Sequence, residues 1–386
     1  MIKYEWIVDD VALSRLCELL AREDAIAVDT EFMRSDTFYP IAALFQIAAA
    51  STGNGERCYL IDPLVIKDFT PLRQLLSDDG VVKIFHSCSE DLEVFKHFLG
   101  VVPTPLFDTQ IAAALLNDGP AMSYSALVKQ ELAVDLPKDE TRSNWLTRPL
   151  RAEQERYAAL DVAYLSVVYR RLRQRLLAKG RLTWLQADCA DLVTNALAEP
   201  NVDDYYKKIK SAWKLNAKQL NLLRALSLWR EQTARRIDKP RNHVVHEKLL
   251  WEIAKMMPTE LEPIKALMIG VWGRHKKWAQ ELWQICQQVG ANGSPTDTLL
   301  LDPPLPLRAR DLVKRLKAVV SEKSEELGLP SEVLAKKSDI ELLIRSGLSN
   351  SGSSDGTFEL PPRLLGWRRE VIGDLLLTTA NDSNRN

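Results

Sequence analysis

The sequence has no long hydrophobic run and little cysteine. None of its apolar stretches approaches the roughly 18 residues that a membrane-spanning helix needs, and residues 1–5 show no signal-peptide pattern. The five cysteines among the 386 residues are scattered and never form a C-x-x-C pair. This pattern argues against disulfides and against a cysteine-bound zinc ion. We therefore expect a cytoplasmic protein with no membrane partner.

The sequence also has almost no net charge, but its charges are unevenly distributed. The formal net charge is −1. Residues 1–200 contain 21 Lys and Arg against 29 Asp and Glu, a balance of −8, and residues 201–386 contain 30 against 23, a balance of +7. An acidic first half suits a part that binds metal, and a basic second half suits a part that attracts a polyanion.

A chain of 386 residues is too long for one typical core, and its pattern changes near residue 200. Short apolar runs predict strands at residues 25–32, 43–49, 57–61, 81–85 and 106–107. The second and third form a hairpin through the turn-rich residues 51–55, and later strands alternate with helices. This order is typical of an α/β domain whose mixed sheet is flanked by helices. We predict this domain at residues 1–200, followed by two all-α helical bundles at residues 211–290 and 305–380.

The strand predicted at residues 25–32 ends in two carboxylates. Side chains alternate along a strand, so Asp29 and Glu31 point to the same face. Two carboxylates on an otherwise apolar strand are costly to bury unless a cation lies between them. Oxygen ligands of this kind suit magnesium or manganese. The alternative is a strand end at which both carboxylates face water.

A third carboxylate, Asp91, follows the strand at residues 81–85. Ser87 and Glu90 have the spacing of a capping box, which predicts a helix that begins just before Asp91. The first turn of a helix favours an ionised carboxylate because the helix dipole and free amide groups point toward it. His86 lies between this strand and this helix. We expect it to be structural or close to the substrate, and not catalytic.

A fourth carboxylate lies on a helix predicted from about residue 152 to residue 177. Tyr157 and Asp161 are four residues apart, so they share one helix face. Tyr164 and Val168 continue this face, which is therefore mostly core. An aspartate on such a face needs a partner, either a metal ion shared with the strand carboxylates or a nearby arginine.

Taken together, these segments resemble a known family. Residues 28–32 (VDTEF), 86–92 (HSCSEDL) and 157–162 (YAALDV) look like the three exonuclease motifs of the DEDD superfamily, in its tyrosine-bearing branch. Residues 89–95 (SEDLEVF) and 143–150 (SNWLTRPL) are similar to bacterial ribonuclease D in particular. The resemblance implies a ribonuclease-H-like fold and removal of nucleotides one at a time from RNA 3′ ends, notably those of tRNA precursors. Arg151 departs from the family pattern, because a helix-capping Thr or Ser is usual there.

The candidate residues fit phosphodiester hydrolysis. Two metal ions about 3.5–4 Å apart can activate a water, stabilise the leaving oxygen and neutralise the phosphate. Four carboxylates, Asp29, Glu31, Asp91 and Asp161, suffice to hold two Mg²⁺ or Mn²⁺ ions. Tyr157 is a poor base at its ordinary pKa near 10, so we expect it to position the attacking water.

Two aromatic residues are candidates for binding the terminal bases. Phe32 and Trp145 could stack on them, and each is at least as well explained as part of the core.

The two helical units resemble the HRDC domain, which RecQ-type helicases share with the C-terminus of ribonuclease D. This half of the chain carries basic clusters that could contact phosphates, at residues 207–210, 235–236, 276–277, 314–315 and 336–337. The first hypothesis is a monomeric, metal-dependent 3′-5′ exoribonuclease whose helical domains bind RNA. The alternatives are a non-catalytic RNA-binding scaffold on an inactive nuclease fold and a DNA 3′-5′ exonuclease. Four intact carboxylates and Tyr157 favour the first.

Overall fold

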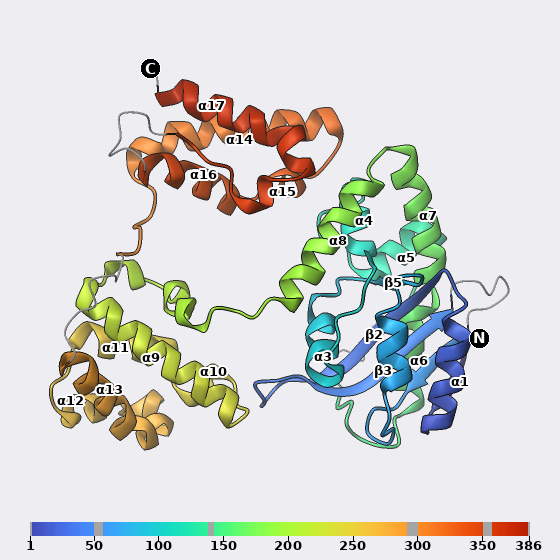
Figure 1. Cartoon of the computed structure of the whole chain (residues 1–386), viewed down its shortest axis with the longest axis horizontal. Coiled ribbons are helices and arrows are strands. Elements are labelled where there is room, and N and C mark those ends of the chain that lie inside the picture. The colour runs from blue at the N-terminus through green and yellow to red at the C-terminus, as the bar shows by residue number, and fades with distance from the viewer. Residues whose placement is uncertain (1, 50–56, 138–142, 292–299, 350–356, 385–386) are drawn as a thin grey trace. The chain divides into compact units, whose positions relative to one another are not determined.

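The computed structural model describes residues 2–49, 57–137, 143–291, 300–349 and 357–384 (Figure 1). The chain forms two compact units. The first contains Met1–Met33, Ile41–Ala198 and Leu305–Asn386, and the second contains Arg34–Pro40 and Glu199–Pro304. No helix among the described residues is long and apolar enough to span a membrane.

The first unit is built on a mixed six-stranded sheet. Its strands are β1 (Lys3–Ile7), β2 (Ala25–Met33), β3 (Ile41–Ala49), β4 (Arg57–Ile61), β5 (Val82–Phe85) and β6 (Leu106–Asp108). Their order in the sheet is β1-β4-β3-β2-β5-β6. The β2–β3 and β3–β4 pairs are antiparallel, and the β1–β4, β2–β5 and β5–β6 pairs are parallel. The predicted mixed sheet and hairpin pairing are therefore confirmed, while the predicted turn at residues 51–55 lies outside the described residues.

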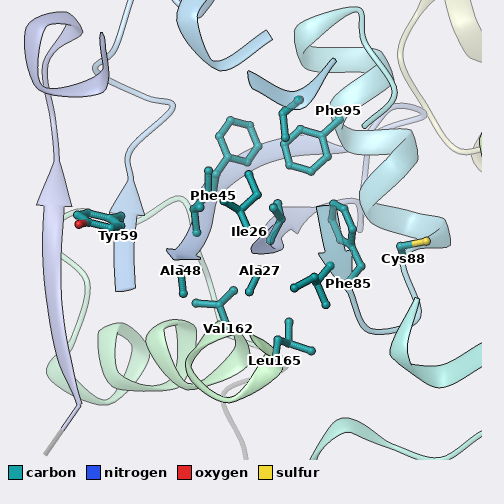
Figure 2. Packing of buried hydrophobic residues seen from close by; sticks show 14 of the residues in the cluster. Ile26, Ala27, Phe45, Ala48, Tyr59, Phe85, Cys88, Phe95, Val162 and Leu165 are labelled. Carbon is teal, nitrogen blue, oxygen red and sulfur yellow. The ribbon is translucent and has the colours of Figure 1, made fainter. Parts of the chain in front are cut away.

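Helices cover both faces of this sheet. They are α1 (Asp10–Leu20), α2 (Thr70–Leu76), α3 (Ser89–Leu99), α4 (Thr109–Leu115), α5 (Tyr124–Leu132), α6 (Ala152–Ala163), α7 (Leu165–Ala178) and α8 (Leu182–Leu197). Figure 2 shows Phe45 of β3 beside Phe95 of α3 on one face, and Ala27 and Ala48 beside Val162 of α6 on the other. Because side chains alternate along a strand, Asp29 and Glu31 share the face of Ala27, which α6 covers.

The predicted capping box at the start of α3 is wrong. The helix begins at Ser89, and Ser87 has a positive φ of 62°. The buried carboxylate of Asp108, at the end of β6, accepts hydrogen bonds from the backbone N–H groups of Ser87 (3.2 Å) and Cys88 (2.9 Å). A residue distant in sequence therefore fixes this turn, and Asp91 still lies in the first turn of α3.

The predicted helix from residue 152 to residue 177 is also wrong, because it breaks at Tyr164 into α6 and α7. The Tyr124 hydroxyl donates to the Leu160 carbonyl (3.1 Å) and accepts from the Tyr164 N–H (3.3 Å). These are the two groups that a continuous helix would join, so the inserted hydroxyl explains the break. The start is as predicted despite Arg151, whose N–H donates to the Gln154 side chain (3.1 Å).

The remaining segments are helical. In the second unit they are η1 (Val202–Lys208), η2 (Ala212–Lys214), α9 (Ala217–Arg236), α10 (Arg241–Val244), α11 (Glu247–Met256), α12 (Leu261–Leu267), η3 (Gly270–Trp278) and α13 (Ala279–Ala291). The C-terminal part of the first unit contains η4 (Leu307–Ala309), α14 (Arg310–Leu327), α15 (Ser331–Leu334), α16 (Lys337–Ser349), η6 (Pro362–Leu364), η7 (Arg369–Gly373) and α17 (Asp374–Asn384). Each set surrounds a hydrophobic core of its own.

Polar and aromatic contacts attach this C-terminal part to α8. The Trp184 and Trp367 rings stack 4.4 Å apart at an interplanar angle of 5°. The Asp188 carboxylate accepts from both terminal nitrogens of Arg368 (2.6 and 2.7 Å) and from the Trp367 indole (3.0 Å).

Candidate active site

Three carboxylates meet beside the end of β2. Asp29 and Glu31 project from one face of this strand, and Asp161 projects from α6, which packs against β2. One carboxylate oxygen from each residue lies within 4.8 Å of the others, and among the described residues this is the only such group of potential metal ligands. The structure thus brings together three of the four carboxylates that the sequence singled out.

Asp91, the fourth carboxylate, lies next to this group but outside it. It is 7% exposed in the first turn of α3, and its Oδ1 accepts a hydrogen bond from the hydroxyl of Thr30. Thr30 lies between Asp29 and Glu31 on β2 and points to the opposite face, so it connects the strand to α3. Thr30 was not among the predicted site residues, and its only signal in the sequence is its position between Asp29 and Glu31.

Burial and repulsion from neighbouring carboxylates raise the pKa of all four carboxyl groups. Burial is the main cause in each case; it raises the pKa of Glu31 to about 9, with repulsion from Asp161 and Asp91 added. The pKa of Asp161 is raised to about 8, although a hydrogen bond from Tyr157 opposes the shift, and the pKa of Asp91 is raised to about 7. The pKa of Asp29 lies well above its ordinary value because burial and the other three carboxylates act together. Such a cluster is stable in its ionised form only with compensating positive charge.

Tyr157 lies one helical turn before Asp161 on α6, as predicted. Its hydroxyl is hydrogen-bonded to the Asp161 carboxylate. Burial first, and then the charges of Asp161, Glu31 and Asp29, raise the pKa of this phenol above its ordinary value. The phenol is therefore a hydrogen-bond donor at neutral pH and not a base.

Trp145 is not placed to stack on a base. It is 1% exposed, and its ring packs against Tyr157 with centroids 6.1 Å apart. Arg148 fixes this segment: it donates to both carboxylate oxygens of Asp62 (2.6 and 2.9 Å) and to the carbonyls of Trp145 (2.8 Å) and Ala43 (2.6 Å). The core alternative therefore fits Trp145, and base stacking is incompatible with its burial.

Phe32 is half-buried against the main core, so its stacking role stays a prediction. His86 lies among structural contacts. Its Nδ1 is 2.9 Å from the Thr109 hydroxyl and its Nε2 is 3.0 Å from the Met122 carbonyl. Burial lowers the pKa of His86.

Comparison with known proteins identifies the class to which this fold and site belong. A family profile described as 3′-5′ exonuclease matches residues 4–177. Profiles described as HRDC domain and as ribonuclease D, C-terminal HRDC domain, match residues 219–286 and 308–376. A mixed sheet with clustered carboxylates, together with these matches, defines a divalent-metal-dependent 3′-5′ exonuclease with helical C-terminal domains.

Full-length relatives narrow this class to one family. Ribonuclease D of Pseudomonas paraeruginosa is 43% identical over 97% of this chain and 96% of its own length. Ribonuclease D of Escherichia coli is 34% identical over 97% and 98%, respectively. The crystal structure of Escherichia coli RNase D, described as an exoribonuclease involved in structured RNA processing, matches with a TM-score of 0.87 and 32% identity over 99% of both chains. The chain belongs to the ribonuclease D family and is a 3′-5′ exoribonuclease.

Proposed function

We propose that Asp29, Glu31, Asp91 and Asp161 hold two divalent cations, Mg²⁺ or Mn²⁺, and are the catalytic carboxylates of this exoribonuclease. The observation that carries this assignment is the cluster of oxygens from Asp29, Glu31 and Asp161 within 4.8 Å of one another. Hard oxygen donors without histidine or cysteine suit these two ions. Bound there, the cations would acidify the attacking water and neutralise charge on the phosphate.

The protein's own groups orient the reaction. Tyr157 keeps its proton and donates it in a hydrogen bond to the Asp161 carboxylate, so its phenol oxygen accepts a hydrogen bond from the water that attacks the terminal phosphodiester and positions that water. Asp161 fixes the phenol, and Thr30 fixes Asp91. Attack breaks the bond between phosphorus and the 3′ oxygen of the preceding nucleotide. A nucleoside 5′-monophosphate leaves, and the RNA keeps a new 3′ hydroxyl.

We further propose that the substrates are tRNA precursors with 3′ extensions, and that a monomeric enzyme acts on them in the cytoplasm. The relative from Escherichia coli is described as acting in structured RNA processing. The helical domains, which we place at residues 211–290 and 305–380 after a nuclease domain at 1–200, lie in the half of the chain with a balance of +7. Positive charge of this kind suits contact with the phosphates of a folded RNA.

The direct test is incubation of an end-labelled, 3′-extended tRNA with the full chain. Mg²⁺ or Mn²⁺ should support stepwise shortening, a chelator should abolish it, and Asp29→Ala should remove it while the chain stays folded. Glu18→Ala, at an exposed position of α1, is the matched control and should be fully active. A single-stranded DNA of the same 3′ sequence tests the alternative substrate. Near-normal activity of Asp29→Ala would refute the proposed site.

A further inference from the structure

β3 carries one polar side chain in an apolar strand. This residue, Gln46, is fully buried at 0% exposure. Among the described residues, neither its carboxamide nitrogen nor its carboxamide oxygen has a hydrogen-bond partner. Buried polar groups are normally paired, because an unpaired donor or acceptor destabilises the folded state. A buried glutamine with two unpaired atoms therefore requires an explanation.

The strand pairing places Gln46 beside the carboxylate cluster. Gln46 is the direct partner of Asp29 in the antiparallel β2–β3 pair. In such a pair the two side chains project to the same face, with Cβ atoms about 4.5–5.5 Å apart. Figure 2 identifies the face: Ala27 and Ala48, two residues from Asp29 and Gln46, point toward Val162 of α6. The Gln46 side chain thus lies on the face that Asp29 shares with Asp161.

We propose that Gln46 is a positioning residue of the metal site and that, when a cation is bound, its carboxamide N–H donates a hydrogen bond to the Asp29 carboxylate. This inference rests on the proposed role of Asp29 as a ligand. A carboxylate that binds a cation through one oxygen keeps lone pairs on the other, and such ligands are usually held by further hydrogen bonds. A neutral amide fixes the orientation of Asp29 without the positive charge that a lysine would bring into competition with the cation.

The competing explanation is that Gln46 merely fills core volume. The flanking residues of β3 on the same face, Leu44 and Ala48, are apolar, and a methionine would fill the same space without unpaired atoms. The two explanations differ in one measurable respect. A core residue affects stability alone, whereas a residue that orients Asp29 affects cation affinity without being a ligand.

The test is calorimetric titration of Mn²⁺ into the full chain at pH 8, with wild type, Gln46→Met and Ile47→Met compared. Ile47 follows Gln46 on the opposite face of β3 and is equally buried, so Ile47→Met controls for a methionine in this strand. We expect Gln46→Met to bind Mn²⁺ about 10- to 100-fold more weakly, the usual effect of losing a hydrogen bond to a ligand. Ile47→Met should bind like wild type. In the presence of chelator, Gln46→Met should melt at or above the wild-type temperature, because an unpaired amide has been removed.

Unchanged Mn²⁺ affinity in a folded Gln46→Met chain would overturn the proposal. The proposal would also be overturned if, in the presence of chelator, Gln46→Met lost more melting temperature relative to wild type than Ile47→Met does. That result would show that the amide is a structural group. Gln46→Leu serves as a second apolar variant if the Gln46→Met chain does not fold. If the wild-type chain itself bound no Mn²⁺, the proposed metal site would fail, and that result is distinct from failure of the role of Gln46.

Discussion

Raising the pH should strengthen Mn²⁺ binding to the carboxylate cluster by at least about tenfold per pH unit between pH 6 and 8, the effect of releasing one proton. Carboxylates bind metal ions in their ionised form, whereas burial raises the pKa of Glu31 to about 9 and that of Asp161 to about 8. Without a cation, Glu31 therefore stays largely protonated throughout this pH range, and Asp161 is about half protonated at pH 8. Release of two protons would make the effect about 100-fold per unit.

The same pKa shifts determine how the stability of the metal-free chain, measured in the presence of chelator, depends on pH. The pKa of Asp91 rises from 3.8 to about 7, so between these values the folded chain holds a proton that the unfolded chain has lost. Rising pH therefore destabilises the metal-free chain. The effect extends from about pH 4, where the unfolded carboxyl groups ionise, to about pH 9, the pKa of Glu31 in the folded chain. A net shift of one pKa unit over the whole site is about 1.4 kcal/mol, or about 3–6 °C in melting temperature for a domain of about 200 residues. Saturating Mn²⁺ should remove most of this dependence.

The assay is calorimetric titration of Mn²⁺ at pH 6, 7 and 8, in two buffers with different ionisation enthalpies. The difference in heat between buffers gives the number of protons released. Glu31→Gln is the matched variant: it should bind more weakly at pH 8 and release about one proton fewer. An affinity that stays constant from pH 6 to 8, with no dependence on buffer, would show that the carboxylates are already ionised and would refute this reasoning.

Three further predictions concern Tyr157, the ion pair between Asp188 and Arg368, and the exposed lysines at positions 276 and 277. Tyr157→Phe removes only the hydroxyl, so RNA affinity should persist while turnover falls about 10²–10⁴-fold; an unchanged rate in single-turnover assays would make Tyr157 a core residue. Asp188→Ala leaves the buried Arg368 guanidinium without its carboxylate, so denaturant unfolding should show a loss of about 3–5 kcal/mol, and a loss below 1 kcal/mol would contradict the buried pair. Alanines at the exposed Lys276 and Lys277 should flatten the log–log salt dependence of tRNA affinity by about 0.7–0.9 per phosphate contact; an unchanged slope would mean that this pair does not contact phosphate.

The sequence predicted the features that depend on local pattern. The five predicted strands all exist, because short apolar runs and turn residues identify them, and the mixed sheet follows from their order. Asp29 and Glu31 share a face because a strand has a period of two, and Asp161 joins them because α6 covers that face.

The errors share a different physical cause, a contact with a residue distant in sequence. Asp108 replaces the predicted cap of α3 through its bonds to the backbone of Ser87 and Cys88. The Tyr124 hydroxyl breaks the helix at Tyr164. The burial of Trp145 likewise depends on the ion pair that Arg148 forms with the distant Asp62. None of these contacts leaves a trace in the local pattern, so only the folded chain reveals them.

The contact between α8 and the C-terminal helices affects how a truncation experiment is interpreted. Trp367 stacks on Trp184, and Arg368 pairs with Asp188, so the described residues of the C-terminal part (305–349 and 357–384) cover part of the surface of α8. Deleting these residues removes basic side chains and also exposes an indole face and an unpaired carboxylate. A loss of RNA binding after this deletion therefore has two physical causes, a missing phosphate contact and a destabilised nuclease domain. Only the first of these flattens the salt dependence of binding, so the slope distinguishes the two causes where the affinity alone does not.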